Sequence, residues 1–84
     1  MNATQMIQQI KRLISNEVLV GVNANEIDDE ASLIADLHLD SIQMIELVTS
    51  LENEFSIELE DEDLDLQFFS TVKALAEFVQ SKLT

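Results

Sequence analysis

Apolar residues recur at intervals of three and four in three stretches of the chain, which is the spacing of one buried face of an α-helix. The first set is Met6, Ile7, Ile10, Leu13, Ile14 and Val18, the second is Met44, Leu47, Val48, Leu51 and Phe55, and the third is Val72, Leu75, Ala76, Val79 and Leu83. The 84 residues include no proline and one glycine, so little interrupts these patterns. We predict helices over residues 4–19, from residue 41 to about 55, and from about residue 72 onward.

Residues that favour helix N-caps stand at the start of each predicted helix. Thr4 is the expected cap of the first helix, Asp40 or Ser41 of the second, and Ser70 or Thr71 of the last. Because the N-terminus of a helix attracts negative charge, an acidic or phosphorylated group is favourable at the start of the second helix.

The segments between these helices are less regular. Residues 20–40 contain the loop formers Gly21, Asn23 and Asn25, and a connection of this length inside a small domain is usually functional. Its apolar cluster of Leu33, Ile34 and Leu37 indicates one anchored turn. Residues 56–60 alternate like a short strand but have no strand to pair with. Leu64, Leu66, Phe68 and Phe69 indicate a short helix or turn that closes the core. We therefore predict an all-α fold, a small helical bundle that forms one domain over residues 1–84.

The charge of the chain limits what it can bind. Four basic residues against 17 acidic ones give a formal net charge of −13. This balance argues against binding of nucleic acid or anionic membranes and favours the approach of basic partners. The absence of cysteine excludes disulfides, zinc–thiolate sites and a thiol nucleophile. With no membrane-spanning apolar run and no signal-peptide pattern at residues 1–9, we expect a cytoplasmic protein.

The helix predicted from residue 41 has apolar residues on two faces. Its core stripe covers roughly 140° to 240° of the helical wheel, whereas Ile42 and Ile45 lie on the far side with Glu46, Thr49 and Glu52. One interpretation is that one of the two isoleucines packs under the long loop. The other is a docking surface, in which apolar contacts give affinity and carboxylates steer a basic partner.

Two catalytic or metal-binding interpretations are weak. His38 and Ser41, with Asp36 and Asp40 nearby, contain the residue types of a hydrolase triad, but a helical chain with one glycine offers no nucleophile elbow or oxyanion hole. We therefore expect His38 to be a solvated loop residue.

Asp61, Asp63 and Asp65 have the first three ligand spacings of a calcium-binding EF-hand loop. The pattern then fails, because Leu66 stands where glycine is required and Val72 where glutamate is required. We expect no metal site there and interpret these residues as a solvated acidic run.

The segment from Leu37 to Leu47 resembles the attachment site of the acyl carrier protein family, in which Asp-Ser-Leu is followed by an acid and leucine. The corresponding residues here are Asp40-Ser41-Ile42 and Glu46-Leu47. Ala31-Ser32-Leu33 with Asp36-Leu37 is similar to the family's loop anchor, residues 51–55 to the end of its second helix, and Ser70-Thr71-Val72 to the start of its last helix. The resemblance covers about residues 5–83.

The resemblance implies a four-helix bundle with a long loop between helices one and two and a short third helix. It also implies that Ser41 carries 4′-phosphopantetheine, loaded from coenzyme A by a phosphopantetheinyl transferase that uses Mg²⁺, with Asp40 helping to orient that enzyme. The chain would then be a monomeric carrier of acyl or aminoacyl thioesters and would catalyse no reaction. Its partner-facing residues would be Ile42, Ile45, Glu46, Thr49 and Glu52. Met44, Val48 and the apolar residues of 64–69 would line a groove for an acyl chain.

Several residues differ from the carriers of primary fatty acid synthesis. His38-Leu39 replaces the usual Gly-Ala, Gln43 replaces an acid, and Glu60 stands where proline often enters the third helix. These differences resemble free-standing carriers of polyketide, nonribosomal or other specialised pathways, although a housekeeping fatty acid carrier remains an alternative. An alternative of another class is an unmodified acidic adaptor that binds a basic partner, in which Ser41 is only a helix cap.

Overall fold

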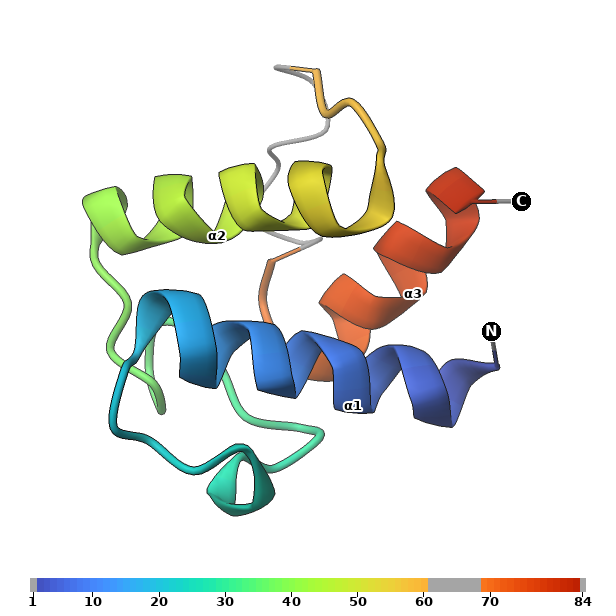
Figure 1. Ribbon diagram of the computed structural model, residues 1–84. Helices are drawn as coiled ribbons and strands as arrows, with labels where there is room; N and C mark the ends of the chain where they lie inside the picture. Colours follow the sequence, from blue (N-terminus) through green and yellow to red (C-terminus); the bar gives the residue numbers. More distant parts are fainter. Residues whose placement is uncertain (1, 61–68, 84) are drawn as a thin grey trace.

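The computed structural model describes residues 2–60 and 69–83, and these residues are helical wherever they form regular structure (Figure 1). The elements are α1 (Ala3–Leu13), the π-helix η1 (Ile14–Val18), the 3₁₀-helix η2 (Ala24–Glu26), α2 (Ser41–Phe55) and α3 (Val72–Leu83). The described part contains no strand, only an isolated bridge between Ser32 and Thr71. The all-helical prediction is confirmed for this part, whereas the expected short helix around Leu64–Phe68 lies outside the described residues.

The first helix begins earlier than the sequence predicted. Asn2 is its N-cap, and its side chain accepts a hydrogen bond of 2.8 Å from the Gln5 N–H while the Gln5 side chain accepts one of 3.0 Å from the Asn2 N–H. The choice of Thr4 was therefore wrong, because this reciprocal capping box needs its cap three residues before Gln5.

The end of the first helical segment also differs from the prediction of one continuous helix over residues 4–19. The α-helix changes to a π-helix at Ile14, and the Leu19 N–H donates to the Ile14 carbonyl at 2.7 Å, a five-residue step. The Ser15 hydroxyl donates to the Arg12 carbonyl at 3.0 Å and so competes with the regular helical bonds. Both Ile14 and Val18 remain buried in this wider turn.

The core lies where α1 meets α3 and where α2 meets α1 and η1 (Figure 1). Removal of its apolar side chains from water is the main force that holds three short helices together. The largest fully buried side chains are Met6, Ile10, Ile14, Leu33, Leu47, Leu51, Val72, Leu75 and Val79. Leu83, which the pattern placed on the core face of the last helix, is 44% exposed because it lies in the final turn, beyond the packed part of α3.

The connection between η1 and α2 is attached to the start of α3 by backbone hydrogen bonds. The Val72 N–H donates to the Ala31 carbonyl at 3.1 Å, and the Leu33 N–H donates to the Ser70 carbonyl at 3.0 Å. Leu33 is completely buried and Leu39 almost so, and the Leu39 N–H donates to the Leu33 carbonyl at 3.0 Å. These contacts fix the chain directly before α2.

An ion pair joins the same connection to α1. The Lys11 ammonium contacts the Asp29 carboxylate, and the Asp29 carbonyl accepts a hydrogen bond of 2.9 Å from the Lys73 N–H. The Lys11 side chain is only 9% exposed, whereas that of Asp29 is 52% exposed. One of the few basic residues of this acidic chain is thus used inside the fold.

Helix α2 ends at Phe55, where Ser56 adopts a left-handed conformation with φ 53° and ψ 43°. This conformation reverses the chain direction, and the Ile57 N–H donates to the Glu52 carbonyl at 3.2 Å. Residues 57–60 form no strand, so the alternating pattern there was not a strand signal. No helix within residues 2–60 and 69–83 has the length and apolar character required to cross a bilayer.

Candidate functional site

The start of α2 is capped by Asp40 and not by Ser41. The Asp40 carboxylate accepts a hydrogen bond of 2.8 Å from the Gln43 N–H, and the Gln43 side chain accepts one of 3.0 Å from the Asp40 N–H. Asp40 has the extended backbone typical of an N-cap, with φ −91° and ψ −178°. This capping box resolves the choice between the two candidate caps.

Ser41 is therefore the first residue of the helix proper. Its side chain is exposed, and among the described residues its hydroxyl makes no hydrogen bond. The first N–H groups of an α-helix lack partners within the helix, and here Asp40 occupies only that of Gln43. An exposed hydroxyl beside unpaired N–H groups is a suitable position for a phosphate ester.

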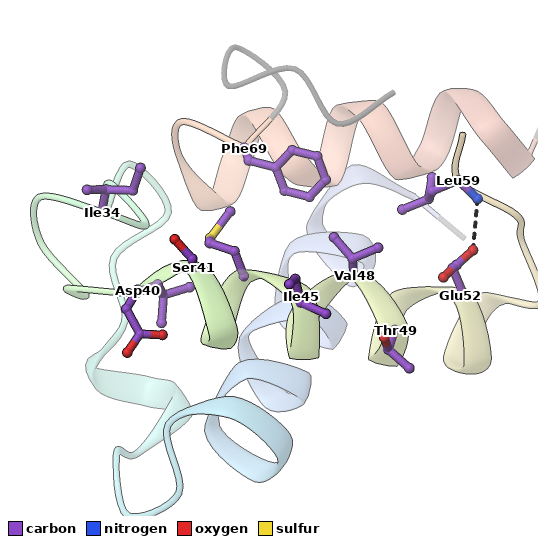
Figure 2. A pocket seen from close by; sticks show the side chains of 11 residues that line it. Ile34, Asp40, Ser41, Ile45, Val48, Thr49, Glu52, Leu59 and Phe69 are labelled. Carbon is purple, nitrogen blue, oxygen red and sulfur yellow. Dashed lines mark hydrogen bonds between the residues drawn. The ribbon is translucent and has the colours of Figure 1, made fainter. Parts of the chain in front are cut away.

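An open groove of about 830 Å³ runs from Ser41 along α2 (Figure 2). Most of its lining is apolar, and the few polar groups lie at its ends and along one edge. The apolar residues are Ile34, Leu39, Met44, Ile45, Val48, Leu59 and Phe69, and the polar ones are Asp40, Ser41, Thr49 and Glu52.

Helix α2 supplies one wall of this groove through its periodicity. Ser41, Ile45, Val48 and Glu52 follow one another at steps of four, three and four residues, so they share one face of the helix. At 1.5 Å per residue this face extends about 16 Å from Ser41 to Glu52. The face lies between the buried stripe that includes Leu47 and the exposed side of the helix.

The remaining lining comes from three other parts of the chain. Ile34 belongs to the connection before α2, Leu59 to the segment after it, and Phe69 precedes α3 (Figure 2). The Phe69 ring packs against Phe78 of α3, with ring centroids 6.1 Å apart. Ile34, Leu39 and Leu59 were not predicted to line a site, because no periodic pattern covers them. Met44, Val48 and Phe69 were predicted to line such a groove, and they do.

The predicted docking residues separate into two groups. Ile42 and Ile45 are 69% and 66% exposed, so neither packs beneath the loop. Glu46 and Thr49 are also exposed. Ile45 and Thr49 border the groove, whereas Ile42 and Glu46 lie outside it.

Glu52, the fifth predicted docking residue, is partly buried and makes an internal contact. Its Oε2 accepts a hydrogen bond of 3.0 Å from the Leu59 N–H (Figure 2). Its carboxylate is thus less available to a partner than that of Glu46.

The hydrolase residues are not assembled into a triad. His38 is exposed with φ 57°, and no hydrogen bond joins it to Ser41 among the described residues. The Asp36 carboxylate accepts a hydrogen bond of 2.7 Å from the Ser32 N–H instead of orienting His38. Within residues 2–60 and 69–83 no group of three potential metal ligands is present, and Asp61, Asp63 and Asp65 lie outside this part.

Comparison with known proteins gives one consistent result. The family profile described as the phosphopantetheine attachment site matches residues 8–79. An acyl carrier protein of Thermotoga maritima is 33% identical over 79 residues, which cover 94% of this chain and 93% of the relative.

Two solved structures have the same fold. The solution structure of a holo acyl carrier protein from Nitrosomonas europaea has a TM-score of 0.81 and 25% identity, with 94% of this chain and 96% of that chain covered. A carrier protein from Agrobacterium tumefaciens, crystallised with an engineered Bradyrhizobium japonicum glycine:[carrier protein] ligase and ATP, has a TM-score of 0.77 and 28% identity, with 90% and 97% covered. The chain therefore belongs to the acyl carrier protein family, whose members are carriers with a covalently attached 4′-phosphopantetheine and not catalysts.

Proposed function

We propose that this chain is a discrete carrier that holds acyl or aminoacyl groups as thioesters on a 4′-phosphopantetheine arm attached to the Ser41 Oγ. The observation that carries this proposal is the division of roles at the start of α2. Because Asp40 caps the helix, the Ser41 hydroxyl is exposed and has no hydrogen bond to the described residues. A serine needed only as a cap would accept from a helix N–H.

The surroundings of Ser41 fit such an arm. The unpaired N–H groups of the first turn can donate to the phosphate oxygens, and the apolar groove begins at the same residue. When bound, the arm supplies the thiol that forms the thioester, and the protein supplies the anchor and an apolar surface beside it. Met44, Val48 and Phe69 would contact an apolar cargo, since they belong to the apolar lining of the groove.

Asp40 has a second role in this proposal. Capping uses one of its two carboxylate oxygens, and the residue is exposed next to the reacting hydroxyl. In keeping with the family resemblance, Asp40 would help to orient the phosphopantetheinyl transferase and its Mg²⁺.

The exposed side of α2 is the proposed docking surface, formed by Ile42, Ile45, Glu46, Thr49 and Glu52. Two exposed isoleucines supply apolar contact area, and the carboxylates favour a partner with a basic patch. The crystallised complex between a related carrier and a ligase supports a loading enzyme as one such partner. We propose a polyketide, nonribosomal or other specialised pathway over fatty acid synthesis, because His38-Leu39 and Gln43 differ from primary fatty acid carriers.

The test is the intact mass of the protein after incubation with coenzyme A, Mg²⁺ and a promiscuous phosphopantetheinyl transferase. We expect the wild type to gain one phosphopantetheine and Ser41→Ala to gain none. Ser50→Ala, a change at another serine of α2, is the matched control and should be loaded like the wild type. No gain on folded wild-type protein would contradict the proposal and favour the unmodified adaptor.

A further inference from the structure

At the far end of the groove, one residue of α2 accepts hydrogen bonds from the segment that follows the helix. Residues 57–59 return along the helix after the turn at Ser56, and they bond to Glu52 in two places. The Glu52 carbonyl accepts from the Ile57 N–H at 3.2 Å, and its carboxylate accepts from the Leu59 N–H at 3.0 Å. Leu59 is partly buried and lines the groove, so the second bond determines where one part of the wall lies (Figure 2).

This hydrogen bond is of a stronger kind than those between neutral groups. The acceptor is a carboxylate, and bonds to ionised acceptors are shorter and about twice as strong as neutral ones. Glu52 is also partly buried, so water competes less for its oxygen atoms than it does at Glu46, which is exposed. The Leu59 N–H donates to a side chain, so its position depends on that side chain. An N–H inside a helix donates instead to a backbone carbonyl.

We propose that Glu52 is a positioning residue whose carboxylate holds Leu59 in the wall of the groove, and that it thereby sets how well an aliphatic acyl chain is shielded there. The proposal rests on the proposed function, because the chain reaches the groove from an arm on Ser41. An aliphatic chain is the expected occupant, since seven of the eleven lining residues are apolar and the groove begins at the attachment residue. This role is separate from docking, for which Glu46 is the more available carboxylate.

Three variants distinguish the effect of the hydrogen bond between Glu52 and Leu59 from the effect of the negative charge on Glu52. Glu52→Ala removes the acceptor, whereas Glu52→Gln removes the charge but retains a carbonyl oxygen that can accept from the Leu59 N–H. Glu77→Ala removes an exposed carboxylate from α3, away from the groove and the docking surface, and is the control. Circular dichroism establishes that each variant keeps its helices.

The first readout is amide hydrogen exchange at Leu59 in the unmodified chain. We expect exchange at least about tenfold faster in Glu52→Ala, the factor that corresponds to the lower end of the range for a hydrogen bond to a charged group. Exchange in Glu52→Gln should be faster than in the wild type and slower than in Glu52→Ala, and exchange in Glu77→Ala should match the wild type. Equal exchange in Glu52→Ala and the wild type would overturn the proposed contact.

The second readout is the rate at which hydroxylamine cleaves the thioester after a promiscuous phosphopantetheinyl transferase with Mg²⁺ has transferred the octanoyl-phosphopantetheine arm from octanoyl-coenzyme A to Ser41, with release of adenosine 3′,5′-bisphosphate. Cleavage should be several-fold faster in Glu52→Ala than in the wild type and in Glu77→Ala, because the wall of the groove is no longer held. Equal rates in loaded proteins would overturn the shielding role while leaving the carrier function intact. A wild type that takes up no octanoyl group would overturn the carrier function and shielding together, whereas amide exchange would still decide whether Glu52 holds Leu59.

Discussion

The two segments that flank α2 are attached to the fold in different ways. The segment before the helix bonds to α3 through Ala31 and Leu33 and to α1 through the Lys11–Asp29 ion pair. In the part of the chain that the structure describes, the segment after the helix donates hydrogen bonds from Ile57 and Leu59 to Glu52, and both side chains are only partly buried against the core.

This difference corresponds to the two tasks that we propose for the site. An attachment serine must be presented to enzymes in one position, and the firmly attached segment ends at Asp40 and Ser41. The wall of a groove that accepts cargo must adjust, and the segment after α2 supplies the partly buried Leu59 to that wall. Parts of a protein with few buried contacts open at lower free energy, which makes them suitable for such adjustment.

We expect the largest difference in the free energy of unfolding when one leucine from each segment is replaced by alanine. Leu33 is completely buried, so Leu33→Ala should lower the free energy of unfolding by about 2–5 kcal/mol. Leu59 is partly buried, and Leu59→Ala should cost only about 1 kcal/mol. Urea unfolding measures both values. Equal losses would show that the two segments are held with similar strength.

Removal of Asp29 and removal of Lys11 from their ion pair should lower the free energy of unfolding by different amounts. Asp29→Asn leaves the nearly buried Lys11 ammonium without its partner and should cost about 2 kcal/mol, less than for a fully buried pair because Asp29 is half exposed. Lys11→Met leaves a carboxylate that water can solvate, so it should cost less than Asp29→Asn in the same urea experiment.

The exposed pair of Lys73 and Glu30, 3.7 Å apart, is the control for this ion pair. Glu30→Gln should change stability by less than about 0.5 kcal/mol. A loss from Glu30→Gln as large as that from Asp29→Asn would contradict a special role for Lys11 in attaching the connection.

The smallest expected effects come from the two left-handed residues, one on each side of α2. His38 has φ 57° and Ser56 has φ 53°, a region that costs free energy for residues with a Cβ atom. His38→Gly and Ser56→Gly should each raise stability by up to about 1 kcal/mol, reduced by the greater entropy of glycine in the unfolded chain.

Ser50→Gly is the matched control, because Ser50 is an ordinary interior residue of α2 and glycine lowers helix stability there. Thermal unfolding of the three variants gives the comparison. A loss of stability in Ser56→Gly would contradict this expectation. It would mean that the Ser56 side chain stabilises the fold by more than its left-handed backbone destabilises it.

The sequence predicted those features of the fold that depend on residues close to one another along the chain. The spacing of Met6, Ile10 and Leu13 or of Leu47 and Leu51 is a local property, and these residues are buried as predicted. The same periodicity placed Ile42 and Ile45 away from the core stripe of α2, but it left open whether one of them packs under the loop, and the structure shows that both are exposed.

Features that depend on tertiary contacts or on competing local bonds could not be predicted in this way. The roles of Ile34 and Leu59 in the groove require knowledge of how distant segments pack. The burial of Lys11 depends on Asp29, which lies 18 residues later in the chain. The π-helix at Ile14–Val18 changes the backbone hydrogen bonding while Ile14 and Val18 stay buried, so the apolar periodicity does not reveal it.

The most direct test of the account measures the stability and the loading of Ser41→Ala together. If Asp40 caps α2 and the Ser41 hydroxyl is reserved for the arm, this variant should unfold within about 0.5 kcal/mol of the wild type and yet gain no phosphopantetheine. Asp40→Ala should instead lose about 1 kcal/mol, the usual cost of a missing N-cap. A Ser41→Ala protein that is destabilised by a similar amount, or that still gains the mass of the arm, would contradict the central claim.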